Sequence, residues 1–169
     1  MSKVIIGVMG PGAGASPVDL DYGRELGQRI AAEGWILLTG GRQAGVMDAA
    51  SQGAKQAGGL TLGILPGRDR QGMSAAVDIA IVTDLGNGRN NVNVLTSDVV
   101  IACGMGAGTA SEIALAIKNY KPLILLNLSD RACGFFHSLA PHQVKVANNP
   151  KQAIEMARGW LDKIRKMRG

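Results

Sequence analysis

The stretch IACGMGAGTASEIALAI, residues 101–117, runs from an apolar segment through three alternating glycines into an amphipathic pattern. An apolar run followed by residues of helical periodicity predicts a buried strand leading into a helix. A glycine-rich turn between the two has two possible uses. It lets the chain reverse tightly, or it exposes backbone N–H groups at the helix N-terminus to an anion. Other parts of the chain bear on which use applies here.

Short apolar segments alternate with helical patterns along the whole chain. Strands are expected at 3–9, 35–41, 60–66, 77–83, 98–104, 122–128 and 143–147. Helices are expected at 18–33, 45–56, 89–96 and 109–119, with a final helix within 150–169. Residues 128–142 show no regular pattern and are expected to form a loop or flap. The alternation predicts an α/β fold of three layers, Rossmann-like, with a mainly parallel sheet of about seven strands and helices on both faces.

The composition indicates one globular domain spanning residues 1–169, since this length suits a single core. The two cysteines, Cys103 and Cys133, have no CxxC spacing, which favours a reducing compartment. No apolar run approaches the roughly 18 residues of a membrane span, and the apolar N-terminal run is too short for a signal peptide. We therefore expect a cytoplasmic protein with no membrane partner.

The formal net charge of +5 is concentrated at the end of the chain. Residues 150–169 hold six basic and two acidic side chains, which accounts for +4 of that charge. Basic residues near a helix C-terminus are favoured by the helix dipole, so a solvated helix end explains them. A nucleic-acid surface would need basic residues interleaved with aromatic residues or glycine along a groove, and only Trp160 is nearby. We expect no nucleic-acid partner.

Glycine-rich loops follow three of the expected strands: GPGAGAS from Gly10, GGRQAG from Gly40 and GMGAGT from Gly104. In a parallel sheet these loops share the carboxyl edge, where ligands bind. Three such loops favour a phosphate-bearing ligand over tight turns alone, with Gly10 and Gly12 as candidates in the first loop.

Several classes of site are excluded by motif. The first loop does not fit GxGxxG, Thr39 stands near where a dinucleotide site wants an acidic residue, and no P-loop motif is present. His137 and His142 lack the spacing and acidic neighbours of a metal site, so neither a metal nor another cofactor is predicted. A mononucleotide or sugar-phosphate ligand remains.

Two blocks resemble the LOG (LONELY GUY) family of Rossmann-fold phosphoribohydrolases: GGxxxGVM with its continuation through residue 66, and Arg89 with the later GxGTxxE ending at Glu112. Within this resemblance, the sequence of residues 88–126 is most similar to the branch related to molybdenum-cofactor carrier proteins. The name "lysine decarboxylase-like", often attached to such chains, finds no support in these residues.

The resemblance implies binding of a nucleoside 5′-monophosphate and hydrolysis of its N-glycosidic bond to free base and ribose 5-phosphate. It also implies that the protein forms a homodimer or a dimer of dimers. The site residues that it implies are as follows. Phosphate would lie on Gly104, Gly106, Gly108 and Thr109; Arg89 and Glu112 would flank the ribose as catalytic residues; Gly40, Gly41, Gly45, Val46 and Met47 would line the cleft.

The chain departs from the usual LOG motifs in ways that leave two functions open. In PGGxGTxxE, Gly104 replaces the proline and Met105 the first glycine; in MHxRK, Asn87 replaces the histidine and Asn90 the lysine. Retention of Arg89 and Glu112 favours a phosphoribohydrolase. The departures favour a non-catalytic carrier or sensor of molybdenum cofactor or another nucleotide-like ligand.

Overall fold

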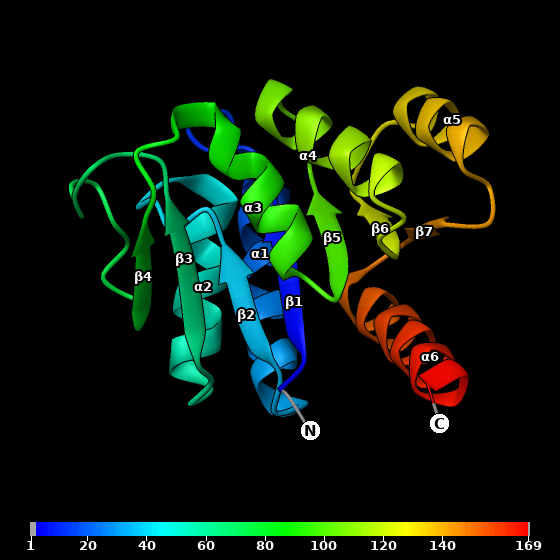
Figure 1. The fold of residues 1–169 in the computed structure, drawn as a ribbon, viewed down its shortest axis with the longest axis horizontal. Coiled ribbons are helices and arrows are strands. Elements are labelled where there is room, and N and C mark those ends of the chain that lie inside the picture. Colours follow the sequence, from blue (N-terminus) through cyan, green and yellow to red (C-terminus); the bar gives the residue numbers. More distant parts are fainter. Residues whose placement is uncertain (1–2, 169) are drawn as a thin grey trace.

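The structure, a computed structural model, describes residues 3–168 and contains one seven-stranded sheet (Figure 1). The strands are β1 (Ile5–Met9), β2 (Ile36–Thr39), β3 (Thr61–Leu65), β4 (Ile79–Val82), β5 (Val99–Cys103), β6 (Leu123–Leu126) and β7 (Val144–Ala147). Their order is β4-β3-β2-β1-β5-β6-β7, and every neighbouring pair is parallel. The predicted α/β fold with a parallel sheet is confirmed.

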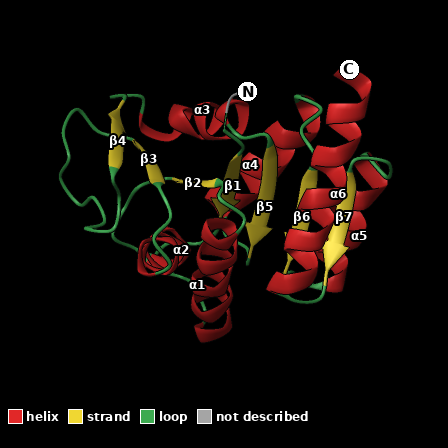
Figure 2. Cartoon of the chain, turned by 90° about the horizontal axis from the view of Figure 1, so that it is seen from below, coloured by secondary structure: helices red, strands yellow, loops and turns green. Residues whose placement is uncertain are grey.

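Helices follow the strands and cover both faces of the sheet. They are α1 (Pro17–Ala32), α2 (Gly45–Gln56), α3 (Arg89–Thr96), preceded by the 3₁₀ turn η1 (Gly86–Gly88), α4 (Ala107–Lys118), α5 (Asp130–Leu139) and α6 (Pro150–Arg168). Figure 2 shows α3 on one side of β1, β2 and β3, with α1 and α2 on the other. The three-layer arrangement is the one that strand–helix alternation predicts.

The core has two parts, one on each face of the sheet. On one face, α1, α2 and α6 pack on alternate residues of the central strands, for example Ile30 and Leu161 against Ile101 and Ile124. On the other face, α3, α4 and α5 pack on the residues between these, so that Ile113 and Phe136 share a cluster with Val100. Central strands buried on both faces explain why their sequences are continuously apolar.

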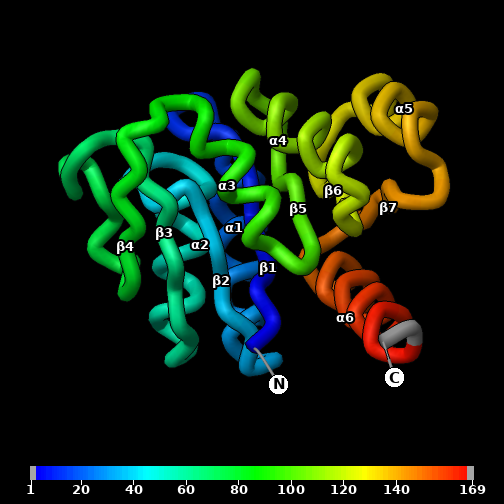
Figure 3. The backbone as a smooth tube through the Cα atoms, viewed as in Figure 1, coloured from blue at the N-terminus to red at the C-terminus, as the bar shows by residue number. Residues whose placement is uncertain are grey.

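The strand order reverses between β1 and β5, because the chain runs outward from β1 to β4 and then returns to the other side of β1. Gly7 pairs with Val100 across this junction. The loops that follow β1, β2 and β5 leave the sheet at the same edge, as the backbone trace shows (Figure 3). This is the position at which open parallel sheets bind ligands.

Two predictions about secondary structure are corrected. Residues 128–142, expected to be a loop or flap, contain the helix α5, which Ser129 caps by accepting a hydrogen bond from the Ala132 N–H. The helix predicted at 109–119 begins earlier, at Ala107, so Gly108 and Thr109 belong to its first turn. Within residues 3–168, no helix is both long and apolar enough to cross a membrane.

Candidate functional site

A cavity of about 320 Å³ opens at the carboxyl edge of the sheet, beside the ends of β1 and β5. We call it the site cavity. Its walls come from the loops after β1, β2 and β5 and from the starts of α2, α3 and α4. Nine of the thirteen residues predicted for the site line it: Gly10, Gly12, Gly40, Met47, Arg89, Gly106, Gly108, Thr109 and Glu112. Their joint role as ligand contacts stays a prediction.

The other four predicted residues, Gly41, Gly45, Val46 and Gly104, lie outside the lining. Val46 is fully buried, and a Cβ on Gly10 would approach its side chain to 2.6 Å. Gly45 lies against the backbone of the first glycine loop, because a Cβ there would meet the carbonyl oxygens of Pro11 and Gly12. Gly45 and Val46 therefore pack behind the first glycine loop.

Gly104 explains one of the departures from the LOG motif. Its φ is +77°, in the left-handed region, whereas a proline ring holds φ near −65°. A Cβ at this position would also collide with the carboxylate of Asp19, whose Cγ would be 2.6 Å away. Asp19 is buried, and it accepts hydrogen bonds from Asn127 Nδ2 at 2.7 Å and from the Ser16 N–H at 2.9 Å. The loop before α4 therefore follows a path that proline could not adopt.

The start of α4 offers backbone donors to the cavity. Its N-cap, Gly106, has an extended conformation and no side-chain cap, so the first N–H groups of the helix keep their hydrogen-bonding capacity. The start of α1, by contrast, is closed by a capping box between Ser16 and Asp19. Thr109 is 2% exposed, lines the cavity, and its Oγ1 has no hydrogen-bond partner within the described chain. Helix N-termini of this kind favour an anion.

Arg89 contributes a guanidinium to the same cavity. It is 9% exposed and packs over Gly40, since a Cβ on that glycine would collide with Arg89 Nη1 and come within 2.6 Å of Met47 Sδ. Glycine at position 40 thus makes room for the guanidinium. Burial lowers the pKa of Arg89 from its usual value, and the nearby charge of Glu112 opposes that shift. Arg89 takes part in none of the ion pairs found among the described residues.

Glu112 lies one turn into α4 and is 7% exposed. Its Oε1 accepts a hydrogen bond from Asn93 Nδ2 on α3 at 2.8 Å. Burial raises the pKa of Glu112. The hydrogen bond from Asn93 and the charge of Arg89 lower it, but by a smaller amount. A carboxyl with a raised pKa beside a guanidinium can exchange a proton or donate a hydrogen bond to a ligand.

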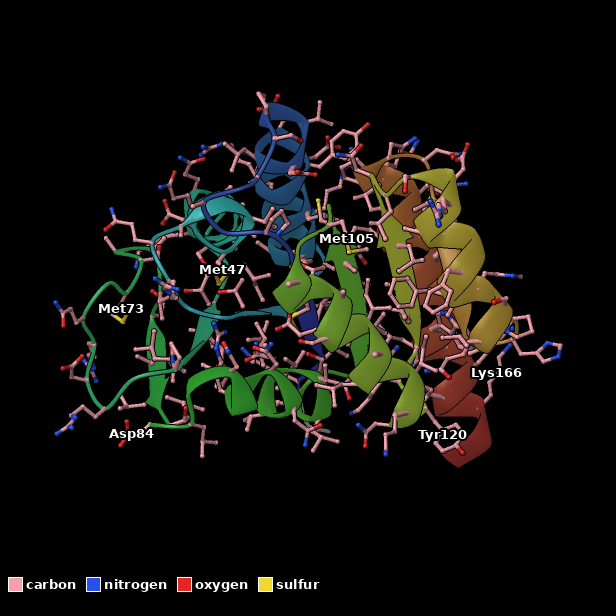
Figure 4. The ribbon with its side chains drawn as sticks, turned by 90° about the horizontal axis from the view of Figure 1, so that it is seen from above. Met47, Met73, Asp84, Met105, Tyr120 and Lys166 are labelled. Carbon is pink, nitrogen blue, oxygen red and sulfur yellow. The ribbon has the colours of Figure 1, made fainter. Side chains whose placement is uncertain are left out.

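Sequence reasoning missed Arg42 as a site residue, although it lines the cavity within the second glycine loop. A cation inside a glycine loop at the end of a strand was the signal that could have revealed it. Asn87, Asn90 and Met105, identified only as departures from the motifs, also line the cavity. Figure 4 shows Met47 on α2 and Met105 in the loop before α4.

A family model described as the SLOG cluster4 family matches residues 3–154. The chain belongs to the SLOG cluster4 family. The resemblance to LOG-like proteins is therefore confirmed, and so is the resemblance to the branch related to molybdenum-cofactor carriers, on the similarities that follow.

Two solved structures are similar to this SLOG protein over nearly their whole length. The molybdenum cofactor binding protein of the phototrophic bacterium Rippkaea orientalis is 59% identical, with a TM-score of 0.94 and coverage of 95% of this chain and 99% of that one. The molybdenum cofactor carrier protein of Chlamydomonas reinhardtii is 51% identical, with a TM-score of 0.91 and the same coverage of 95% and 99%.

A more distant relative is an enzyme. The protein named cytokinin riboside 5′-monophosphate phosphoribohydrolase, from Mycobacterium tuberculosis, is 33% identical over 96 residues, which are 56% of this chain and 51% of that protein. The SLOG protein is thus similar both to carriers and, over a shorter segment, to a hydrolase.

The arrangement provides anion-binding groups and one buried carboxyl. The helix start, Thr109 and the two arginines can hold a phosphate, and Glu112 lies in the wall of the same cavity. Among the described residues, no cluster of three or more His, Cys, Asp and Glu could hold a metal ion.

Proposed function

We propose that this protein binds the molybdenum cofactor, or a phosphorylated ligand of the same chemistry, and carries it without hydrolysing it. The observation that carries the proposal is the site cavity itself. One wall offers the uncapped start of α4 and Thr109, and another offers Arg42 and Arg89. Asn87, Asn90 and Met105 stand in the same lining, where the usual LOG motifs have histidine, lysine and glycine.

The cationic groups suit the phosphate end of such a ligand. Arg42 and Arg89 are the two guanidinium groups of the lining, whereas Glu112 is its one carboxyl. The first turn of α4 adds aligned N–H dipoles and the unpartnered Thr109 hydroxyl. A phosphate monoester would satisfy these donors together. The molybdenum cofactor is a phosphorylated pterin, and the similarity to proteins named as its carriers supports the same ligand here.

The replaced residues support binding without turnover. Asparagine at 87 and 90 has no group that gains or loses a proton near neutral pH, so it cannot replace a histidine or lysine in acid–base work. Met105 adds a side chain that is 38% exposed to a loop where the motif has glycine. The cavity keeps its anion-binding groups while losing two of the titratable ones.

A second candidate function is phosphoribohydrolysis, which a specific observation favours. Arg89 and Glu112 line one cavity with Thr109, so a nucleotide held by its phosphate would bring its ribose near both. A carboxylate there could stabilise the oxocarbenium-like centre and orient water. The relative from Mycobacterium tuberculosis carries that name.

One experiment separates the two functions. Purified protein is incubated with molybdenum cofactor and, separately, with a panel of nucleoside 5′-monophosphates, and both ligand retention after gel filtration and free base are measured. We expect the protein to retain the molybdenum cofactor and to release no base from any nucleotide. Catalytic release of base that disappears in Glu112→Gln would contradict the carrier proposal and establish the hydrolase.

A further inference from the structure

A second hollow lies next to the site cavity, between η1 and the start of α3 on one side and α4 on the other. Its volume is about 600 Å³, and we call it the outer groove. Its walls include Asn87, Asn90, Asn91, Ser111, Ala107 and Leu115. Asn87, Asn90, Ala107 and Gly108 line both spaces, so the two hollows adjoin each other, and we refer to them together as the cleft. A ligand held by phosphate in the site cavity can therefore extend into the outer groove.

The polar groups of the outer groove are mainly carboxamides. Asn90 Nδ2 donates to Ser111 Oγ at 2.9 Å, and Ser111 Oγ donates to the Gly108 carbonyl oxygen at 2.7 Å. This chain of bonds holds Asn90 in place and leaves its Oδ1 as an acceptor with no partner in the described chain. The exposed Asn87 carboxamide has no side-chain hydrogen bond within residues 3–168, so both its donor and its acceptor are available.

The remaining lining of the outer groove is uncharged. Ala107 and the half-buried Leu115 add apolar carbon from α4. None of its residues carries a charge, whereas the site cavity contains Arg42, Arg89 and Glu112. The cleft thus has a charged inner end and a neutral outer end with free amide groups. A neutral flat ring can lie on the apolar carbon and present its edge to the carboxamides.

We propose that the outer groove binds the heterocyclic ring of the ligand and selects rings with a lactam edge, in which an N–H lies beside a C=O. The proposal rests on the proposed function, since it takes the phosphate to lie in the site cavity. A carboxamide matches a lactam in both directions, donating to its C=O and accepting from its N–H. Asn87 can make this pair of bonds, and Asn90 Oδ1 offers one further acceptor. Pterins and guanine-type purines carry such an edge.

The test uses three ligands that share one phosphate. Inosine 5′-monophosphate has a lactam edge, purine riboside 5′-monophosphate has the same ring and ribose without it, and ribose 5-phosphate has no ring. Dissociation constants are measured by calorimetry for the wild type and for Asn87→Leu. Gln28→Leu, which changes an exposed carboxamide of α1 outside both cavities, is the matched control.

We expect the wild type and Gln28→Leu to bind inosine monophosphate about tenfold more tightly than purine riboside monophosphate, as a pair of hydrogen bonds warrants. Asn87→Leu should lose most of that preference. Equal affinity of the wild type for the two nucleotides would overturn the inference and leave phosphate binding intact. If Asn87→Leu changes the oligomeric state but not the preference, the groove is a contact between copies of the chain, which also overturns it. Failure of ribose 5-phosphate to bind at all would instead count against the proposed function.

Discussion

Asn93 Nδ2 donates a hydrogen bond to Glu112 Oε1 at 2.8 Å, and this bond joins α3 to α4 beneath the site cavity. Asn93 is fully buried and Glu112 is nearly so. Two further polar atoms are buried without partners in the described residues. They are Asn93 Oδ1, on the same carboxamide, and Thr109 Oγ1, three residues before Glu112. The carboxyl therefore depends on one neutral donor and on the nearby charge of Arg89.

Replacing Asn93 tests that dependence. We expect Asn93→Leu to lower the free energy of unfolding by about 1–3 kcal/mol, because it leaves a buried carboxyl without its donor. Chemical denaturation measures the change. Asn119→Leu is the control. It removes a half-buried carboxamide whose Nδ2 donates to the Leu115 carbonyl oxygen rather than to a carboxyl group. The cost at Asn93 should disappear in a Glu112→Leu background, which removes the acceptor of the bond; an unchanged cost there would show that the bond to Glu112 is not its source.

The pH dependence of stability follows from the raised pKa of Glu112. The folded protein keeps the Glu112 proton at pH values where the unfolded chain, near the ordinary value of 4.5, has lost it. The contribution of this group to stability is therefore fully present below that value and is lost as the pH rises through the folded pKa. Glu112→Gln does not titrate, so the free energy of unfolding of the variant minus that of the wild type should increase as the pH rises above 4.5.

Denaturant unfolding from pH 4 to pH 8 measures this difference. Glu155→Gln, at an exposed carboxylate of α6, controls for the loss of a surface charge. A difference for Glu112→Gln that stays flat or falls with increasing pH would refute a raised pKa.

The conformation of Gly104 can be compared with that of a matched glycine elsewhere. Gly58 has φ +74° and open space around it, whereas Gly104 has φ +77° and the Asp19 carboxylate beside it. We expect Gly58→Ala to cost roughly 1–2 kcal/mol from φ alone and Gly104→Ala to cost more. Removing the carboxylate with Asp19→Ala should reduce the additional cost at position 104. Equal costs at the two glycines would mean that Asp19 does not constrain the loop.

Substitution of Gly108 tests whether a phosphate binds at the start of α4. A Cβ on Gly108 meets nothing within 4 Å, so Gly108→Val should fold while its side chain fills space at the start of α4. We expect ribose 5-phosphate affinity to fall by about tenfold or more, because the side chain blocks approach to the helix N–H groups. Gly159→Val, in an equally open position on α6, is the control and should bind as the wild type does. Wild-type affinity in Gly108→Val would mean that the glycines serve only as a tight turn.

The order of strands and helices was predictable because strands buried on both faces are apolar throughout and the helices between them are periodic. The helix α5 was missed because Phe136 is its one buried residue, which gives too weak a period to recognise. Its N-cap, Ser129, is the local signal of the helix in the sequence.

The glycine loops of the site could be recognised because backbone approach leaves a local signature. Arg42 and Asn93 carry no such backbone signature, although a cationic side chain within a glycine loop is a signal of its own. Arg42 is exposed, and its position in the cavity follows from the path of its loop. Asn93 acquires its role only when α3 packs against α4 and brings it to Glu112, 19 residues away along the chain.

We propose that the site cavity carries a phosphorylated pterin without cleaving it. The most direct test is to mix the purified protein with stoichiometric molybdenum cofactor and to measure the cofactor that remains bound after gel filtration, in the wild type and in Gly108→Val. We predict near-stoichiometric retention by the wild type and loss of retention in the variant. Equal retention by both proteins, or none by the wild type, would contradict the claim.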